Sequence, residues 1–440
     1  MSVTVPGPPI EELGIVDDGP DLDAALIQRV RQMVDHRSGE LVYTRRWLHA
    51  RPEVSRAEFA TTDALRERLQ AEGLQPRVLS VGTGLICDIG GSGPMVALRA
   101  DIDALVMHDA KDVPYRSTNE GACHACGHDV HTAVVLGAGL VLRELITTAQ
   151  VAGRVRLIFE PSEERLPGGS LDVIADGGLD GVSGIFGVHC DPKLDAGQLG
   201  CRIGAITSAS HHLAIDLTGP GGHTARPSLT VNLADEVARV VRELPGAVQA
   251  ADQELATDPA HGEVRLVFGT IHTGSASNVI PSEAALTGSV RTPDPDVSDA
   301  LLHIVPKALA EVLGTDVRPD GDDHRGSRPD GLNWHLRHRP GVTPVVNDAA
   351  ATRAMARAAV AAGGPGCVHD TEHSWGGDTF GWYQGLVPGC YARLGTHWPG
   401  RRDRLDLHRP TYDIDEQAIP FATKTLVLTA LTWLSHQPQP

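Results

Sequence analysis

The chain has 440 residues, of which 41% are hydrophobic and 21% charged, a composition typical of a globular protein with more than one domain. Its 38 lysines and arginines are outnumbered by 56 aspartates and glutamates, which gives a formal net charge of −18. Because such an acidic chain is not attracted to phosphate groups, we expect neither nucleic acid nor an anionic membrane surface as a partner.

Residues 1–20 are acidic and rich in proline and glycine, and we expect a flexible tail there. They lack the basic start and apolar core of a secretory signal, and the longest apolar run, 133–142, is too short to cross a bilayer. The seven cysteines are odd in number and scattered, which argues against a disulfide framework. We therefore expect a cytoplasmic protein.

The first half of the chain alternates between helical patterns and short apolar runs. A Ser-Arg-Ala-Glu capping box at 55–58 is expected to start the second helix. Helices are expected over 21–48, 55–73, 131–145 and 171–175, and strands over 84–89, 95–100, 154–159 and 184–188. Apolar strands that alternate with helices indicate an α/β fold with a mostly parallel sheet, covered by helices on both faces.

The pattern changes after about residue 204. Segments 212–217, 264–271 and 284–290 alternate with period two, and 229–249 and 297–313 have helical periodicity. These elements predict a smaller α+β domain with an antiparallel sheet. The polar stretch 318–331 is expected to be a long loop, and helices return over 348–361 and 415–434. We therefore expect a discontinuous large domain, 21–204 and 343–440, with a smaller domain inserted at 205–342.

Four polar clusters follow or end apolar runs in the first half of the chain. They are RADID at 99–103, CHACGHDVH at 123–131, EPSEE at 160–164 and the single residue His189. Three of them stand at the ends of expected strands. Because ligands of open α/β sheets bind outside the carboxyl ends of the strands, these clusters should meet at one site.

The cluster at 123–131 holds three histidines and two cysteines, which are side chains that bind borderline divalent cations. Spacing alone leaves open which of His124, Cys126, His128 and His131 are ligands. No second pair of cysteines with matching spacing follows, so a compact structural zinc site is disfavoured.

Glu163 and Glu164 are adjacent at an expected strand end, where neighbouring carboxylates can divide the work, one binding a metal and the other moving protons. His189 and His408 add imidazoles from two further places in the chain. Together these residues offer thiolate, imidazole and carboxylate groups for one or two divalent cations. The alternative is that these residues have no function. The two glutamates would then be a solvated acidic pair, and the two histidines would be ordinary core or surface residues.

In this order along the chain, the motifs resemble those of the M20 family of metallopeptidases. Within that family they resemble the amidohydrolase branch of hippurate hydrolases, N-acyl-amino-acid aminoacylases and plant auxin–amino-acid hydrolases. The resemblance covers nearly all of 45–419. It rests on RWLHARPE (46–53), RADIDAL (99–105), HACGHDVHTA (124–133), IFEPSEE (158–164), GVH (187–189), GPGGHTARP (219–227), SNVIP (277–281), GSVRT (288–292) and LHRP (407–410).

The resemblance implies an enzyme that holds two divalent metal ions in an α/β zinc-peptidase domain. It implies the metal ligands Cys126, His128, Glu164, His189 and His408. Cys126 would be the bridging ligand, Glu163 the general acid/base, and Asp103 the acid that orients a ligand. Asp101 stands where other branches have a metal-binding histidine, so it is not expected to be a ligand.

The family fold also has an inserted α+β lid, which agrees with the smaller domain expected at 205–342, and the lid often forms a homodimer. His223, Asn278 and Arg291 match lid positions that contact the substrate in relatives. The alternative is that they do not contact a substrate. His223 would then be an exposed turn residue, Asn278 would cap a turn, and Arg291 would be a solvated charge at a strand edge. The larger, discontinuous domain would be the catalytic one.

The expected reaction is hydrolysis of the amide bond of an N-acyl amino acid or related conjugate by metal-activated water. Zn²⁺ or Mn²⁺ is the expected metal, and Co²⁺ and Ni²⁺ also suit these ligands. A dipeptidase or carboxypeptidase acting on unacylated short peptides is the alternative, because the same site serves both reactions. A catalytically silent ligand-binding protein is disfavoured, since it would have no chemical need of Glu163 beside Glu164.

Overall fold

The computed structural model describes residues 22–148, 151–255 and 263–437, and the tail expected at 1–20 lies outside them. The chain forms two compact units. Unit 1 comprises Met1–Ile206, Val345–Glu372 and Thr379–Pro440, and unit 2 comprises Thr207–Pro344 and His373–Asp378. The short segment His373–Asp378 has no counterpart in the division expected from the sequence, which placed a single insertion at 205–342.

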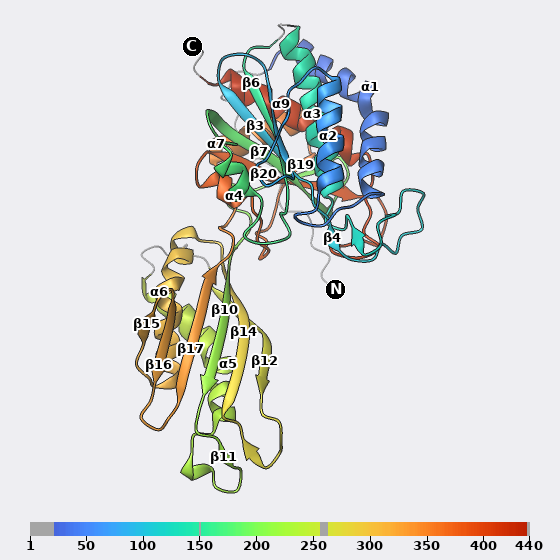
Figure 1. The fold of residues 1–440 in the computed structure, drawn as a ribbon. Helices are drawn as coiled ribbons and strands as arrows, with labels where there is room; N and C mark the ends of the chain where they lie inside the picture. The colour runs from blue at the N-terminus through green and yellow to red at the C-terminus, as the bar shows by residue number, and fades with distance from the viewer. Residues whose placement is uncertain (1–21, 149–150, 256–262, 438–440) are drawn as a thin grey trace. The chain divides into compact units, whose positions relative to one another are not determined.

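Unit 1 is built on an eight-stranded, mostly parallel sheet (Figure 1). In sheet order its strands are β1 (Arg77–Val78), β2 (Leu85–Ile89), β6 (Arg154–Glu160), β3 (Met95–Asp101), β7 (Val182–Asp195), β20 (Gly389–His397), β8 (Leu199–Cys201) and β19 (Val368–Asp370). The central strands β6, β3, β7 and β20 are parallel to their neighbours in this group. They are buried along most of their length, which explains the nearly continuous apolar runs in the sequence.

Helices cover both faces of this sheet, and the strands send alternate side chains to each face. On β3, Val96 and Leu98 point into one helical layer, whereas Met95 and Ala97 point to the opposite face. The larger layer is formed by α1 (Ala24–His49), α2 (Phe59–Ala71), α3 (His128–Thr147), α7 (Ala349–Gly363) and α9 (Ala418–Ser435). The smaller layer contains α4 (Ser170–Ala175) and α8 (Gly381–Gln384). The predicted α/β fold with a mostly parallel sheet is confirmed.

Two short two-stranded sheets complete unit 1. They pair β4 (Leu105–Val106) with β5 (Ala122–Cys123), and β9 (Gly204–Ala205) with β18 (Val346–Asn347).

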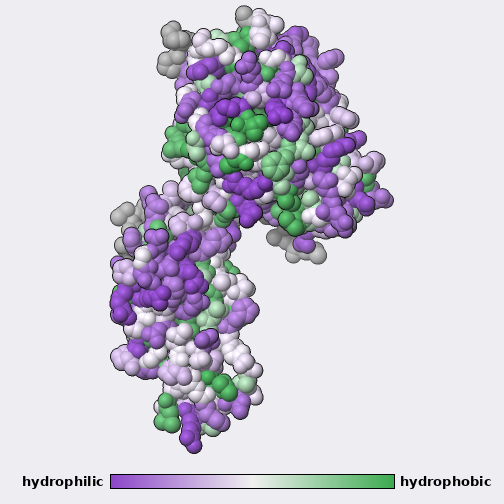
Figure 2. Space-filling view, viewed as in Figure 1, coloured by the Kyte–Doolittle hydropathy of each residue, from purple (hydrophilic) through white to green (hydrophobic). Residues whose placement is uncertain are grey.

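Two helices of unit 1, α3 and α9, are long and apolar enough to cross a membrane by length and composition alone. In the structure 78% and 83% of their apolar segments are buried inside the protein. Glycines let α3 pack closely, since a Cβ at Gly139 would lie 2.3 Å from Leu157 Cδ1 and one at Gly137 would lie 2.7 Å from Leu41 Cδ2. Packing in the core therefore explains the apolar character of both helices. On the face drawn in Figure 2, hydrophilic residues dominate and apolar patches are small.

Unit 2 is built on a six-stranded antiparallel sheet with two helices packed on one face (Figure 1). In sheet order its strands are β12 (Arg265–Thr273), β14 (Glu283–Thr292), β10 (Ala209–Thr218), β17 (Asn333–Pro340), β16 (Asp323–Ser327) and β15 (Arg318–Asp320). Leu213, Ile215 and Leu217 of β10 alternate toward α5 (Leu233–Leu255) and α6 (Pro295–Leu313). A separate ribbon pairs β11 (Gly222–His223) with β13 (Val279–Ile280).

The stretch 318–331 carries the hairpin β15–β16, so the expectation of a long loop is wrong. The hairpin is hard to predict because its strands are short, polar and lie at the edge of the sheet. Gly326 of β16 leaves room for the indole of Trp334, since a Cβ there would lie 2.3 Å from Trp334 Nε1. An ion pair between Arg325 and Asp320 joins the two strands.

A pair of buried histidines lies in unit 2. His211 Nδ1 on β10 is 2.9 Å from His338 Nε2 on β17, and His211 Nε2 is 2.9 Å from Ser298 Oγ on α6. Burial lowers the pKa of His211 to about 4. Burial is also the main cause that lowers the pKa of His338 to about 3, and the nearby His324 and Arg339 act in the same direction. Both rings are therefore neutral at pH 7.

Acid should destabilise unit 2 through these two histidines. Unfolded histidines bind protons below about pH 6.5, but the folded rings do so only near the pKa values given above. Their contribution to stability is therefore complete above pH 6.5 and is lost as the pH falls from 6.5 toward 3. The two pKa values lie about 2.5 and 3.5 below 6.5, which corresponds to about 3 and 5 kcal/mol. We expect the protection factors of the β10 and β17 amides, which compare their exchange rates with those of an unfolded chain at the same pH, to fall over this pH range.

The His338→Gln variant should show a smaller fall of the protection factors, because an amide does not titrate. His212→Gln is the matched control, since His212 is exposed on the same strand as His211. An equal pH dependence of exchange in the wild type and in His338→Gln would contradict this explanation.

Candidate metal centre

The parallel strands bring the polar clusters to one edge of the sheet in unit 1. Asp101, the last residue of β3, pairs with Glu160, the last residue of β6. β3 and β7 are paired as far as Leu98 and Phe186, so His189 lies at the level of Asp101, three residues farther along both strands. The residues that follow β6 and the side chain of His189 therefore reach the same edge, as expected for a ligand site of an open α/β sheet.

A glycine turn places the start of α3 against β7. Gly127 precedes the helix with a φ of 92°, a left-handed conformation that favours glycine. A Cβ at this position would lie 2.6 Å from Cys190 Sγ. The turn thus allows Cys126 and His128, on either side of Gly127, to approach His189.

The structure brings together ligand atoms of all five predicted metal-binding residues in two overlapping groups. One group contains Cys126, His128 and His189, the other contains Cys126, Glu164 and His408, and the atoms of each lie within 4.8 Å of one another. Cys126 Sγ is 3.5 Å from His189 Nε2, and Glu164 Oε1 is 3.4 Å from His408 Nε2. Cys126 belongs to both groups, as a ligand shared by two cations must.

Two atoms of this cluster are buried without a hydrogen-bond partner among the described residues. They are His128 Nε2 and Glu164 Oε1, which lie 3.9 Å apart. His408 Nε2 lies within ion-pair distance of Glu164 Oε1 but does not meet the geometry of a hydrogen bond with it. A buried polar atom left unpaired costs about 1–3 kcal/mol. With the sulfur of Cys126, these nitrogen and oxygen atoms form a donor set that fits a borderline divalent cation.

Both buried imidazoles of the cluster are held by their Nδ1 atoms. His128 Nδ1 lies 2.9 Å from the carbonyl oxygen of Asp103 and 3.2 Å from its Oδ1. His189 Nδ1 lies 2.8 Å from the carbonyl oxygen of Cys190. Nδ1 therefore donates in both rings, and Nε2 is the nitrogen left to bind a metal ion once it carries no proton.

Asp103 also holds the glutamate of the cluster. Its Oδ2 accepts hydrogen bonds from the backbone N–H of Glu164 at 3.0 Å and from Ser55 Oγ at 2.6 Å. The side chain of Asp103 is thus in contact with two of the five predicted ligands. This position is the one expected of a residue that orients metal ligands.

The electrostatics of the cluster favour a cation. Burial opposes the charge of Asp101, but His128, Arg99 and His131 outweigh burial and hold the pKa of Asp101 well below its usual range. Burial likewise opposes the charge of His128, but Asp101 and Cys126 raise its pKa well above the usual value. In the absence of metal, the site therefore attracts a proton to His128. Burial also raises the pKa of the Cys126 thiol, which must lose its proton to become a ligand.

Glu163 lies beside the cluster but has different contacts from Glu164. Its Oε1 accepts a hydrogen bond from the backbone N–H of Thr379 at 3.3 Å. It forms a group with His128 and Glu164 whose ligand atoms lie within 4.8 Å of one another, but it is absent from both groups that contain Cys126. The two adjacent glutamates thus have the distinct surroundings that separate roles require.

The predicted capping box at 55–58 is wrong. The helix begins at Phe59, its N-cap residue Glu58 makes no side-chain cap, and Glu53 accepts the first-turn N–H groups of Ala60 and Thr61. Ser55 instead donates to Asp103. Glu58 Oε1 accepts hydrogen bonds from the backbone N–H groups of Arg56 at 3.0 Å and of Ser162 at 2.7 Å. Ser55 and Glu58 therefore support the cluster, and the only sequence signal for this role is their position just after the RWLHARPE motif.

The three predicted substrate contacts all lie in unit 2. His223 pairs with Val279 across the β11–β13 ribbon, and the carbonyl oxygen of Asn278 accepts a hydrogen bond from Thr224 N at 3.3 Å, which brings His223 and Asn278 close together. Arg291 is near the far end of β14, where its NH1 donates to the carbonyl oxygen of Trp375 at 2.7 Å. Within unit 2, Arg291 is therefore separated from the other two residues.

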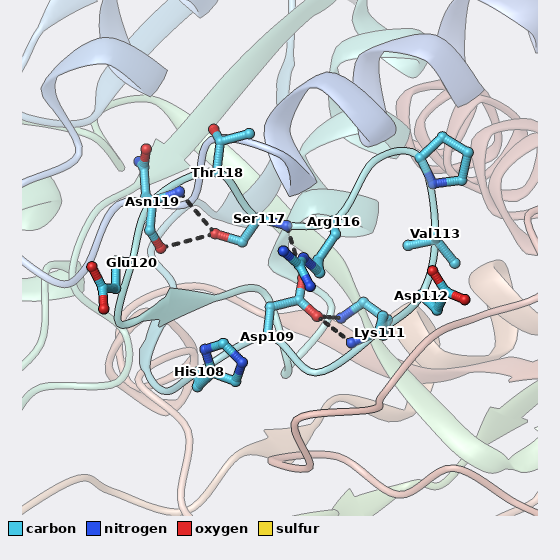
Figure 3. Close-up of a pocket in the computed structure, with 11 residues that line it drawn as sticks. His108, Asp109, Lys111, Asp112, Val113, Arg116, Ser117, Thr118, Asn119 and Glu120 are labelled. Atoms are coloured by element: carbon cyan, nitrogen blue, oxygen red, sulfur yellow. Dashed lines mark hydrogen bonds and ion pairs between the residues drawn. The ribbon is translucent and has the colours of Figure 1, made fainter.

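A hollow of about 650 Å³ opens on the loop between β4 and β5 and is lined by residues between His108 and Glu120 (Figure 3). Asp109 accepts hydrogen bonds there from Lys111 Nζ at 2.9 Å and from the backbone of Ser117 at 2.9 Å. His49, Asp109 and Cys123 form another group of ligand-type atoms, but Lys111 Nζ lies 3.6 Å from Cys123 Sγ and supplies a positive charge. The hollow contains none of the five predicted ligands, and we place the chemistry at the cluster around Cys126.

Residues 97–432 match the model of peptidase family M20/M25/M40. A Bacillus subtilis N-acetyl-L-cysteine deacetylase is 34% identical over 393 residues, which cover 86% of this chain and 85% of that protein. A Rhodococcus jostii protein with the provisional name glutamate–cysteine ligase 2-3 is 39% identical over 399 residues, or 90% of this chain, but the chain spans only 47% of that longer protein.

The fold is also similar to a solved structure. A dinuclear metal-binding peptidase of the M20 family from Bacillus subtilis has a TM-score of 0.74 and 28% identity, with 92% of this chain and 99% of that chain covered. The family match extends over most of the sequence and includes the clusters at the sheet edge. The chain therefore belongs to peptidase family M20/M25/M40, within its amidohydrolase branch of metal-dependent hydrolases.

Proposed function

We propose that this chain hydrolyses the amide bond of N-acyl amino acids with the help of two divalent cations. The observation that carries the proposal is the pair of overlapping ligand groups that share Cys126, with Glu163 beside them. The similarity to an N-acetyl-L-cysteine deacetylase supports this substrate class. The similarity to a dinuclear metal-binding peptidase supports two cations. Zn²⁺ or Mn²⁺ is the proposed metal, because Zn²⁺ suits the thiolate and imidazole ligands and Mn²⁺ suits the carboxylate.

The proposed ligands of one cation are Cys126, His128 and His189, and those of the other are Cys126, Glu164 and His408. When bound, such a pair of cations lowers the pKa of water and polarises the amide carbonyl. Glu163 takes the proton of the attacking water and passes it to the leaving amine. The N–H of Thr379, which donates to Glu163 Oε1, holds the carboxylate in place for both transfers.

His223, Asn278 and Arg291 are proposed substrate contacts. An N-acyl amino acid carries a free carboxylate, and a guanidinium binds a carboxylate through two parallel hydrogen bonds. The hydrogen bond from Arg291 to the carbonyl oxygen of Trp375 uses one of the five N–H donors of the guanidinium. All seven cysteines are buried and outside disulfides, which is compatible with the reducing cytoplasm that we propose as its location.

A panel of N-acyl amino acids and unacylated dipeptides tests the substrate class. The protein is stripped of metal, reloaded with Zn²⁺, Mn²⁺, Co²⁺ or Ni²⁺, and assayed for release of free amine. We expect metal-dependent turnover that is higher on the N-acyl amino acids. Faster cleavage of the dipeptides would replace the proposal by a peptidase function, and no turnover on any compound by the metal-loaded protein would overturn it.

Replacing Glu163 tests the division of roles between the two glutamates. In Glu163→Gln we expect kcat to fall by about 10²–10⁴-fold, because proton transfer is lost, whereas metal content measured by mass spectrometry stays at the wild-type level. Glu164→Gln is the matched control and should lose metal, since its carboxylate belongs to a group with Cys126. Metal loss in Glu163→Gln would assign that residue to the ligands instead.

We also propose that unit 2 forms a homodimer through β12. This strand is at one edge of the sheet, and its Val267 and Ile271 are exposed although apolar. Such an edge is suited to pairing with another strand, whereas short, charged edge strands resist pairing. The opposite edge, β15, is of the second kind, with exposed Arg318 and Asp320.

Charge on β12 should therefore separate the protomers. In the double variant Val267→Lys and Ile271→Lys, the mass measured by light scattering should fall from twice 46.6 kDa to 46.6 kDa. Pro319→Lys on the β15 edge is the control and should leave the dimer intact. A wild-type protein that is monomeric at every concentration would refute the homodimer.

A further inference from the structure

His131 lies beside the metal-ligand cluster with both ring nitrogens in hydrogen bonds. Its Nδ1 is 2.6 Å from Asp101 Oδ1, and its Nε2 is 2.9 Å from the backbone nitrogen of Cys190. A backbone N–H can only donate, so Nε2 is the acceptor, and Nδ1 carries the proton donated to Asp101. Although atoms of His131, Asp101 and His128 lie within 4.8 Å of one another, His131 cannot bind a cation without losing one of these hydrogen bonds.

The N–H of Cys190 needs this partner because β3 no longer supplies one, although β20, on the other side of β7, is still paired with β7 at Cys190. β3 is paired with β7 only as far as Phe186, four residues before Cys190. Cys190 is buried, and a buried backbone N–H without a partner is costly. His131, on α3, therefore replaces β3 as the acceptor of this hydrogen bond.

The carbonyl group of the same residue fixes a proposed metal ligand. Cys190 O accepts the hydrogen bond from His189 Nδ1 at 2.8 Å. This contact leaves the lone pair on His189 Nε2, which faces Cys126 Sγ at 3.5 Å. The position of Cys190 thus determines both the tautomer and the direction of the His189 ring.

Asp101 is held in turn from within the sheet. The guanidinium of Arg99 donates to Asp101 Oδ2 at 2.7 Å and to Glu160 Oε2 at 2.7 Å, and all three residues are buried. Arg99 therefore fixes the carboxylate that holds His131. A continuous series of buried contacts runs from the sheet, through Asp101 and His131, to the backbone beside His189.

We propose that His131 is a positioning residue of the metal centre, which holds the backbone of Cys190 and thereby orients His189 as a ligand. The proposal deepens the proposed function and rests on its two cation sites. Only the group of Cys126, His128 and His189 contains the ligand that depends on this contact. Loss of the contact should therefore weaken one cation site and spare the other.

Two amide variants of the full-length chain separate positioning from a general structural role. His131→Gln places an amide oxygen near the position of Nε2, so it can still accept the N–H of Cys190. His131→Asn is shorter and can replace only the contact with Asp101. Metal-free protein is titrated with Co²⁺ against a competing chelator, and the thiolate-to-metal absorption band is followed, because Cys126 is a proposed ligand of both cations.

We expect wild-type protein to bind two equivalents of Co²⁺. In His131→Asn one equivalent should bind about 10–100-fold more weakly, the usual effect of losing a residue that orients a ligand, while the other is unchanged. His131→Gln should bind both equivalents within a few-fold of the wild type. Equal weakening of both equivalents, or a Gln variant as weak as the Asn variant, would overturn the proposal.

Circular dichroism of the metal-free variants shows whether they fold. If His131→Asn does not, ¹⁵N NMR of histidine-labelled wild type and His131→Gln decides: His189 must carry its proton on Nδ1 in both, and an Nε2–H tautomer overturns the proposal. Amide hydrolysis by the wild type is measured in parallel. A wild type that binds both cations but has no turnover contradicts the proposed function and leaves the result on His131 standing.

Discussion

The buried carboxylate of Asp103 is the contact on which the rest of the metal-ligand cluster depends. It lies two residues after β3 and joins segments far apart in the sequence: the ring of His128 on α3, the backbone of Glu164 after β6, and the hydroxyl of Ser55 before α2. Burial alone would raise the pKa of Asp103, but the hydrogen bonds from His128 and Ser55 keep it below its usual range. The carboxylate thus stays charged and orients His128 and Glu164, two of the proposed metal ligands, together.

Charge balance separates two clusters that have similar residue types. Around Asp109 the acid is balanced by the ammonium of Lys111, which also contacts Cys123. Around Cys126, His128 Nε2 and Glu164 Oε1 are buried without hydrogen bonds among the described residues, and the same holds for His49 Nε2 beside Asp109. The ammonium of Lys111 is therefore what distinguishes the cluster around Asp109. Histidine, cysteine and acidic residues therefore do not make a metal site by composition alone.

The sequence predicted the fold of unit 1 because its signals are local. Apolar runs identify β3 and β6, and the polar residues that end them lie at the sheet edge. Ser55 and Glu58 were misinterpreted because a capping box is also a local pattern. Their actual partners, Asp103 and Ser162, are 48 and 104 residues away. The β15–β16 hairpin was missed for a related reason, since Gly326 is explained only by Trp334 on the adjacent strand.

The histidines of the HACGHDVH motif illustrate what spacing cannot decide. In His128 one nitrogen is held by Asp103 and the other is unpaired, which is the condition for a ligand. In His131 both nitrogens are held, which is the condition for a residue that positions others. In His124 both are buried and unpaired, burial lowers its pKa to about 3, and it is in none of the ligand-atom groups of the described chain. The same residue type therefore has three different surroundings within eight positions, and the tertiary partners of each ring decide which one we propose as a ligand and which as a positioning residue.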